Sequence, residues 1–268
     1  MPSMFNASDA DSYDRMMGRW SRRLAPLFIE HAGAGSGERL LEVGCGTGSL
    51  TFTLARSVAF AELTAIDYAQ VYVAAARARN QDPRIRIEQG DATKLQFPDA
   101  HFDRALSLLV LHFVSDPAAA VAEMRRVTRP GGVVAAAVWD SGGGMLMLRM
   151  FWDTAAMLDP AAVDLRGRAM SKAVVGPGGL ARLFRAAGLA DVDERSLLVR
   201  MEHADFADYW EPLLRGEGPM GSYVAGLGPA ARARLEQHLR AAYLAGGPDG
   251  PRSFAAVAWS CRGIVPGS

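Results

Sequence analysis

The chain has 268 residues, which suits one large α/β domain with additions, and its 29 basic and 29 acidic side chains give a formal net charge of zero. With no excess positive charge, no overall field draws the chain to nucleic acid or to an anionic membrane surface. Two cysteines provide no disulfide framework, and no signal-like N-terminus or bilayer-length apolar run is visible, so we expect an intracellular, cytoplasmic protein without membrane insertion.

The first predicted element is an amphipathic helix within residues 13–32. Apolar side chains recur there at helical spacing: Trp20, Leu24, Leu27 and Phe28. Because proline conflicts with an uninterrupted helix, Pro26 predicts either a helix start near Ala25 or a kink. Three arginines lie before Pro26: Arg19, Arg22 and Arg23. We interpret them as a solvated helix start rather than a polyanion site.

The segment LLEVGCGTGSLT, residues 40–51, is the most informative in the chain. It predicts a strand over 39–43, a glycine turn, and a helix over 49–57. Glycines at 44, 46 and 48 allow a turn that a side chain would block, so the backbone and its free amides can approach a ligand. The spacing differs from the dinucleotide pattern, since Ser49 stands where the third glycine would be. Glu42 would repel a pyrophosphate but would favour a cationic cofactor.

Strand-like and helix-like segments alternate after this turn. The expected strands are 63–67, 85–89, 104–111 and 133–139, and the expected helices are 70–79 and 118–128. Such alternation predicts a mostly parallel, doubly wound sheet with helices on both faces. Glu42, Asp67 and Asp91 end successive strands, so they should meet at the sheet edge where these folds bind ligands.

The second half of the chain is predicted to be more helical. We expect a helical insertion over 141–175, a helix over 177–188, a sixth strand over 192–201, helices within 205–250 that include 229–244, and a seventh strand over 255–261.

The EVGCGTG motif and the LQFPDAHFD stretch at 95–103 resemble class I S-adenosylmethionine-dependent methyltransferases, most closely the branch of the ubiquinone and menaquinone C-methyltransferases. The resemblance covers residues 36–140 best. It implies an α/β, Rossmann-like sheet of seven strands, mostly parallel with the last strand antiparallel, and helical lid insertions. The implied organisation is an N-terminal lid segment (1–35), a cofactor-binding core (36–140), a helical insertion (141–175), a continuation of the core (176–204), a helical lid insertion (205–252) and a last core strand with the tail (253–268).

The resemblance also implies roles for individual residues. Asp67 would bind the ribose diol of S-adenosyl-L-methionine, Tyr68 would lie against the adenine, and Asp91 with the Ala92 backbone would contact the adenine edge. The backbone of Leu108 would border the methionine half. The residues expected at the cofactor are Glu42, Gly44, Cys45, Gly46, Gly48, Asp67, Tyr68, Asp91, Ala92 and Leu108.

Catalysis and acceptor binding have weaker signals. His112 is a candidate general base or orienting group, because an ordinary imidazole titrates near neutrality; a structural histidine is the alternative. Four aromatic residues are candidates for an acceptor pocket, with ordinary core packing as the alternative: Tyr13, Trp20, Trp139 and Trp152. No cysteine–histidine cluster has the spacing of a zinc site, so we expect no metal.

The sequence therefore predicts transfer of a methyl group from S-adenosyl-L-methionine, which leaves as S-adenosyl-L-homocysteine, to a small organic acceptor. Positioning and exclusion of water would supply most of the acceleration. A non-catalytic S-adenosylmethionine-binding sensor or assembly module, or an NAD-dependent oxidoreductase, are the alternatives. The expected partner is a small molecule and not nucleic acid. The acceptor, the methylated atom and the oligomeric state, monomer or homodimer, stay open.

Overall fold

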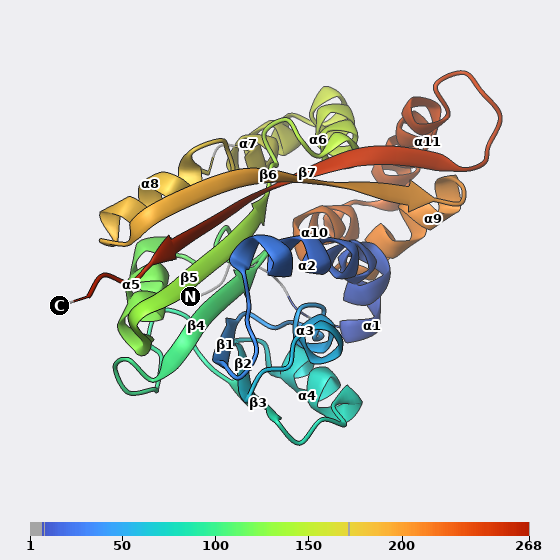
Figure 1. The fold of residues 1–268 in the computed structure, drawn as a ribbon. Helices are drawn as coiled ribbons and strands as arrows, with labels where there is room; N and C mark the ends of the chain where they lie inside the picture. The colour runs from blue at the N-terminus through green and yellow to red at the C-terminus, as the bar shows by residue number, and fades with distance from the viewer. Residues whose placement is uncertain (1–6, 8, 171, 268) are drawn as a thin grey trace.

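The computed structural model describes residue 7, residues 9–170 and residues 172–267. A seven-stranded sheet with the order β3-β2-β1-β4-β5-β7-β6 runs through the molecule (Figure 1). The neighbours from β3 to β5 pair in parallel, whereas β7 is antiparallel to both β5 and β6. The strands are β1 (Arg39–Val43), β2 (Glu62–Asp67), β3 (Ile85–Gln89), β4 (Phe102–Leu108), β5 (Thr128–Trp139), β6 (Ala190–His203) and β7 (Arg252–Ile264). The predicted fold class is confirmed.

Helices cover both faces of the sheet because its strands are apolar on both sides. Leu40 joins a core cluster with residues of α2, α3 and α4, while its neighbour Leu41 joins a second cluster with residues of α5 and α8. The helices are α1 (Ala10–Tyr13), α2 (Arg19–Ala32), α3 (Thr51–Ser57), α4 (Gln70–Arg79), α5 (Pro117–Val127), α6 (Leu146–Leu158), α7 (Pro160–Met170), α8 (Gly179–Ala186), α9 (Phe206–Trp210), α10 (Gly218–Gly226) and α11 (Pro229–Leu244), with a π-helical turn η1 (Asp14–Gly18) and a 3-10 turn η2 (Glu211–Arg215).

Several predicted boundaries shift. The fourth strand ends at Leu108 rather than at residue 111, because Leu109 has a left-handed φ of 65° that extended backbone cannot contain. The helix after the glycine turn begins at Thr51, two residues later than expected. Strands β6 and β7 are longer than predicted, since they pair with each other from Ala190 opposite Ile264 to His203 opposite Arg252.

Of the two effects expected of Pro26, a helix start near Ala25 is wrong, and a kink stays a prediction. Helix α2 begins at Arg19, directly after η1, and runs through Pro26 to Ala32. Its buried face includes Trp20, but Leu27 is 36 % exposed and does not belong to that face. Proline removes one backbone donor, yet the packing of α2 against β4 to β7 holds the helix together.

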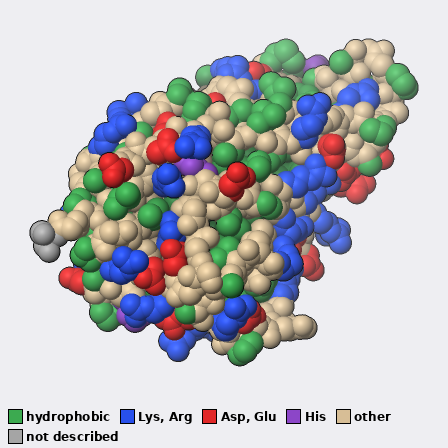
Figure 2. Space-filling model, in the orientation of Figure 1, with side chains coloured by type: hydrophobic (Ala, Val, Ile, Leu, Met, Phe, Trp, Pro, Cys, Tyr) green, Lys and Arg blue, Asp and Glu red, His purple; other side chains and the backbone are tan. Residues whose placement is uncertain are grey.

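Helices of the two predicted insertions pack into the same core cluster as α2. Helices α9 and α11 lie at one end of the long β6–β7 pair (Figure 1). Among the described residues, no helix has both the length and the apolar character needed to span a membrane. Acidic and basic side chains are interspersed over much of the face shown in Figure 2, consistent with the zero net charge.

Candidate functional site

A cavity of ≈ 540 Å³ lies where β1, β2 and β4 end, at the sheet edge predicted to bind a ligand. Nine of the ten residues predicted to contact a cofactor lie on its wall: Glu42, Gly44, Cys45, Gly46, Asp67, Tyr68, Asp91, Ala92 and Leu108. Gly48 is the exception. The cavity is large enough for a nucleoside-sized ligand.

The glycine turn is shaped by close contacts with its surroundings. Gly44 has a φ of 82°, and a Cβ atom there would lie 2.2 Å from Cγ2 of Val110. Gly48 has a φ of 93°, and a Cβ atom there would lie 2.2 Å from the ring of Phe52 on α3. Gly48 is therefore needed for packing behind the turn rather than as part of the cavity wall. Only glycine fits at both positions.

Three amides of this turn are not free, which corrects the expectation for Gly44, Cys45 and Gly46. The N–H groups of Gly44 and Cys45 both donate to the carbonyl of Ile66, each at 2.8 Å. The N–H of Gly46 donates to the Oδ2 atom of Asp67, also at 2.8 Å. Since Ile66 and Asp67 end β2, these bonds fasten the turn to the neighbouring strand. The turn therefore contributes shape, and the acids beside it contribute charge.

Glu42 and Asp67 lie beside this turn on the cavity wall. Glu42 is 1 % exposed, and its Oε2 atom accepts a hydrogen bond from the hydroxyl of Thr51. Burial raises the pKa of Glu42 to about 8, although the hydrogen bond from Thr51 acts to lower it. The negative charge of Asp67 adds to the rise. Burial also raises the pKa of Asp67, although backbone amides, including that of Ala69 at 2.8 Å, oppose the effect. A cationic ligand would favour the ionised form of both acids.

The remaining predicted contacts line the rim and floor of the cavity. Asp91 accepts from the amide and the hydroxyl of Thr93, at 2.8 and 2.7 Å, which fixes the turn after β3. Tyr68 is 50 % exposed, so its ring is available to a planar ligand. Leu108 is the last residue of β4, and the strained backbone of Leu109 follows it.

A second, smaller cavity of ≈ 120 Å³ adjoins the first, because Tyr13, Leu109 and Phe113 line both. His112, Trp139 and Trp152 also lie on its wall, so three of the four aromatic residues predicted for an acceptor pocket are brought together here.

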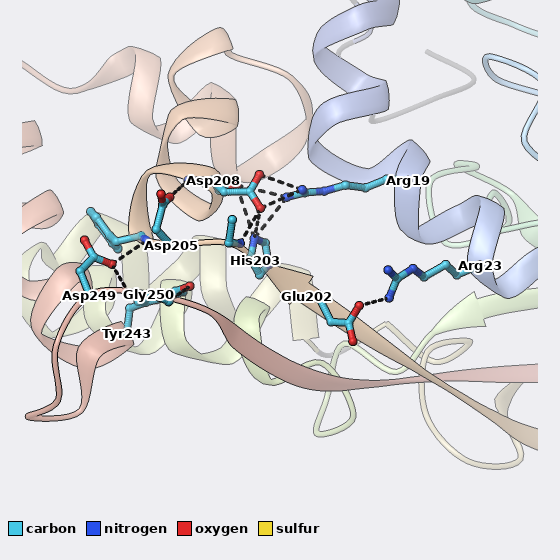
Figure 3. Close-up of polar contacts among 11 residues, drawn as sticks. Arg19, Arg23, Glu202, His203, Asp205, Asp208, Tyr243, Asp249 and Gly250 are labelled. Carbon is cyan, nitrogen blue, oxygen red and sulfur yellow. Dashed lines mark hydrogen bonds and ion pairs between the residues drawn. The ribbon is translucent and has the colours of Figure 1, made fainter.

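Trp20 lies on neither cavity wall, which does not fit its predicted place in an acceptor pocket. It is 2 % exposed, its ring lies 5.4 Å from that of His203, and the Arg19 guanidinium lies 4.3 Å from its centroid. Trp20 therefore packs α2 against β6. The neighbouring arginines form ion pairs that the sequence analysis did not expect: Arg19 pairs with Asp208 at 2.8 Å and Arg23 with Glu202 at 2.8 Å (Figure 3).

The structure argues against His112 as a general base. Burial, together with the positive charge of Lys172, lowers the pKa of His112 to about 3. An imidazole with so low a pKa is neutral near pH 7 and takes up a proton poorly. The Lys172 ammonium donates a hydrogen bond to the carbonyl of His112, which fixes this segment.

Glu217 and Lys172 line the second cavity and were not identified from the sequence. Glu217 is fully buried, accepts a hydrogen bond from the Tyr72 hydroxyl at 3.0 Å, and accepts another from the amide of Asp9. It thus links the segment before α10 to α4 and to the N-terminal segment. Its sequence context, a charged residue between glycines, predicts only an exposed loop.

Comparisons with known proteins agree with this geometry. Residues 41–136 match a family model described as a methyltransferase domain. Over 117 residues the chain is 34 % identical to the ubiquinone/menaquinone biosynthesis C-methyltransferase UbiE of Bdellovibrio bacteriovorus. The aligned region covers 43 % of this chain and 48 % of that protein. The chain spans about half the length of the curated relatives it matches, or less.

Solved structures extend the similarity of fold to nearly the whole chain. The YcgJ protein of Bacillus subtilis has a TM-score of 0.60 at 20 % identity, covering 92 % of this chain and 99 % of that one. Phosphoethanolamine N-methyltransferase 2 of Haemonchus contortus, solved with S-adenosylhomocysteine, has a TM-score of 0.60 at 15 % identity, covering 96 % of this chain and 57 % of that one. At these identities the likeness concerns the fold.

Proposed function

We propose that this chain, whose residues 41–136 match a methyltransferase domain, transfers the methyl group of S-adenosyl-L-methionine to a small organic acceptor. The observation that carries the proposal is a pair of acids on the wall of the large cavity, the buried Glu42 and the half-buried Asp67. Among the described residues, no basic side chain contributes to the pKa of either acid. A ligand that brings its own positive charge fits this site, because it supplies the missing counter-charge.

In this proposal, Asp67 binds the ribose hydroxyls, Asp91 the adenine edge, and Glu42 attracts the cationic methionine end. The sulfonium supplies the methyl group. Gly46 lines the cavity, and an added Cβ atom there would meet no other atom within 4 Å. The glycine turn therefore leaves space for the ligand to lie against the backbone. An NAD pyrophosphate would instead place negative charge near Glu42, so we disfavour the oxidoreductase alternative.

The protein's contribution to the reaction is mainly position and exclusion of water. Displacement at a sulfonium needs the acceptor atom in line with the breaking bond and roughly 3–3.5 Å from the methyl carbon. Because the leaving group is a neutral thioether, no acid has to protonate it. The second cavity, which shares three wall residues with the first, is the proposed acceptor site.

We propose that residues 1–35, 141–175 and 205–252 act as lids over a core formed by 36–140, 176–204 and 253–268. Contacts of the N-terminal segment support this division. Asp14 accepts from the Thr47 hydroxyl of the glycine turn at 2.6 Å and from Arg79 of α4 at 2.6 Å. Glu217, from the third lid segment, bonds to Tyr72 of α4. Both lids thus contact elements beside the large cavity. A cytoplasmic location stays a prediction from the sequence.

Isothermal titration calorimetry with S-adenosylhomocysteine and with NADH tests the proposed cofactor. We expect the former to bind and the latter not to bind. Asp67→Ala should weaken binding by about 1–3 kcal/mol, the cost of losing a buried hydrogen-bonding partner. Asp164→Ala, on the exposed surface of α7, is the matched control. Binding of NADH alone, or unchanged affinity in a folded Asp67→Ala variant, would refute the assignment. Turnover of labelled S-adenosylmethionine with a panel of acceptors then separates an enzyme from a sensor.

A further inference from the structure

Glu217 is a fully buried acid that the proposed transfer does not use. It lies at the N-cap position of α10, yet its side chain makes no capping hydrogen bond there. Its carboxylate instead reaches two distant parts of the chain: Oε2 accepts from the Tyr72 hydroxyl at 3.0 Å, and Oε1 accepts from the amide of Asp9. These donors are 145 and 208 residues away in the sequence. One carboxylate therefore joins the third lid segment to α4 and to the N-terminal lid segment.

The burial of Glu217 makes these two hydrogen bonds costly to break. A hydrogen bond to a carboxylate stabilises more than one between neutral groups, and a buried carboxylate that loses a donor is left poorly solvated. Separation of either lid segment from α4 removes a donor from this fully buried acid. Glu217 therefore favours the arrangement in which all three segments are in contact.

The segments that Glu217 joins form part of the walls of both cavities. Ala7 and Tyr13 from the N-terminal lid line the large cavity together with Tyr72 from α4. Tyr13 and Glu217 line the smaller cavity. The rings of Tyr13 and Tyr72 also pack together, with centroids 5.1 Å apart. Tyr72 lies in the first turn of α4, the helix that follows Asp67. A ligand that fills the large cavity therefore contacts both surfaces that Glu217 holds together.

We propose that Glu217 acts as a latch: through its bonds to Tyr72 and Asp9 it holds the two lid segments against α4 and retains the cofactor in the large cavity. This inference rests on the proposed function, since the retained ligand is the methyl donor or its product. The closed arrangement offers the ligand contacts from the lid and from the core, whereas an open one offers only those of the core. By linkage, the latch strengthens ligand binding by the factor by which the ligand strengthens the latch. Glu217 is thus a positioning residue, because it acts on the ligand through other groups.

Hydrogen–deuterium exchange of the protein without ligand tests the latch itself. Tyr72→Phe removes one donor, and Glu217→Met removes both acceptor atoms at similar length. Each should speed amide exchange at least about tenfold in both η1 and α10, the factor that one such hydrogen bond provides. Glu217→Gln should behave more like the parent, because its amide still accepts from Asp9 and can donate to the Tyr72 oxygen.

Tyr223→Phe is the matched control. The Tyr223 hydroxyl also donates to a carboxylate, that of Asp159 at 2.8 Å, but this bond joins two lid segments and not a lid to α4. Tyr223 lies on neither cavity wall. The control should leave exchange in η1 unchanged. Unchanged exchange in η1 of the Tyr72→Phe variant would refute the latch, even where Glu217→Met does not fold.

Release of S-adenosylhomocysteine, measured by surface plasmon resonance, tests what the latch does. Tyr72→Phe should release the ligand about tenfold faster than the parent, with an association rate that is unchanged or higher. A role in stability alone would lower the melting temperature and leave the release rate unchanged. In the Glu217→Met background, Tyr72→Phe should have no further effect, because the bond it removes is already lost. Additive effects of the two substitutions would contradict the latch.

The two measurements separate this inference from the proposed function. Failure of S-adenosylhomocysteine to bind the parent would count against the proposed function, while the exchange experiment, which needs no ligand, still tests the latch. Binding to the parent with an equal release rate from Tyr72→Phe would overturn this inference alone.

Discussion

Glu42 is expected to destabilise the protein without ligand as the pH rises. Its pKa is about 8 in the folded protein, against an ordinary value of 4.5. A folded pKa above the unfolded one means that stability is fully present below pH 4.5 and is lost as the pH rises through the folded pKa. Each pH unit of this interval corresponds to about 1.4 kcal/mol, so the loss reaches about 3 kcal/mol at pH 7 and about 5 kcal/mol above pH 8.

Glu42→Gln removes this loss, because glutamine keeps the shape and can still accept from the Thr51 hydroxyl. We expect the variant and the parent to be equally stable near pH 4.5. Between pH 5 and 8 the variant should gain about 1.4 kcal/mol per pH unit over the parent. Urea denaturation at several pH values, followed by circular dichroism, measures the difference. Glu236→Gln, on the exposed surface of α11, is the control. A difference that does not change between pH 5 and 8 would refute the reasoning.

The same carboxyl connects stability to ligand binding. A cationic ligand beside Glu42 favours its ionised form, so binding of S-adenosylmethionine near pH 7 should release a proton from the parent. Calorimetry in buffers of different ionisation enthalpy counts that proton. The ligand's own titration is common to both proteins, so the difference between parent and Glu42→Gln isolates the side chain. No difference in proton release would place the cation away from Glu42.

Two further predictions concern the fold around the site. Gly44→Ala should lower the free energy of unfolding by about 2–4 kcal/mol, since the new Cβ would overlap Val110 and the φ of 82° is unfavourable for alanine; a variant as stable as the parent in urea would contradict the close packing. Arg104→Met should cost about 3–5 kcal/mol, because it leaves Glu38 without the guanidinium that bonds it at 2.8 and 2.9 Å. Burial favours a raised pKa for Glu38, but Arg104 and a backbone amide outweigh burial and lower the pKa. The parent should therefore lose the stability that this ion pair contributes on acidification below pH 4.5, whereas Arg104→Met has no such stability to lose. Parallel acid-unfolding curves of the two proteins would contradict this prediction.

Local patterns predicted the sheet edge that carries the large cavity, because its geometry is encoded over short distances. The strand ending at Val43, the glycines that follow it and the acid that ends the next strand each depend on a few neighbouring residues. The alternation of strands and helices then brings these segments to one edge of a parallel sheet. For the same reason, β1, β3, α4 and α11 have the predicted bounds.

Long-range contacts explain what the sequence analysis missed. Glu217 is buried where distant parts of the chain supply donors: the Tyr72 hydroxyl, 145 residues earlier, and the amide of Asp9. Helix α2 tolerates Pro26 because its other residues pack against four strands. Trp20 has the spacing and type of a pocket residue, but His203 and Arg19 occupy the space beside its ring. Neither the periodicity nor the composition of the sequence predicts such long-range partners.

The larger cavity has acids without a basic partner among the described residues, Glu42 and Asp67. Their charged forms are unfavourable in the protein alone, because burial is not offset by a nearby positive charge. A cationic methyl donor supplies that charge. Because Leu109 and Phe113 line both cavities, a ligand in one forms part of the surroundings of the other. An acceptor in the smaller cavity would therefore lie beside the methyl donor, which is the arrangement that the proposed transfer needs.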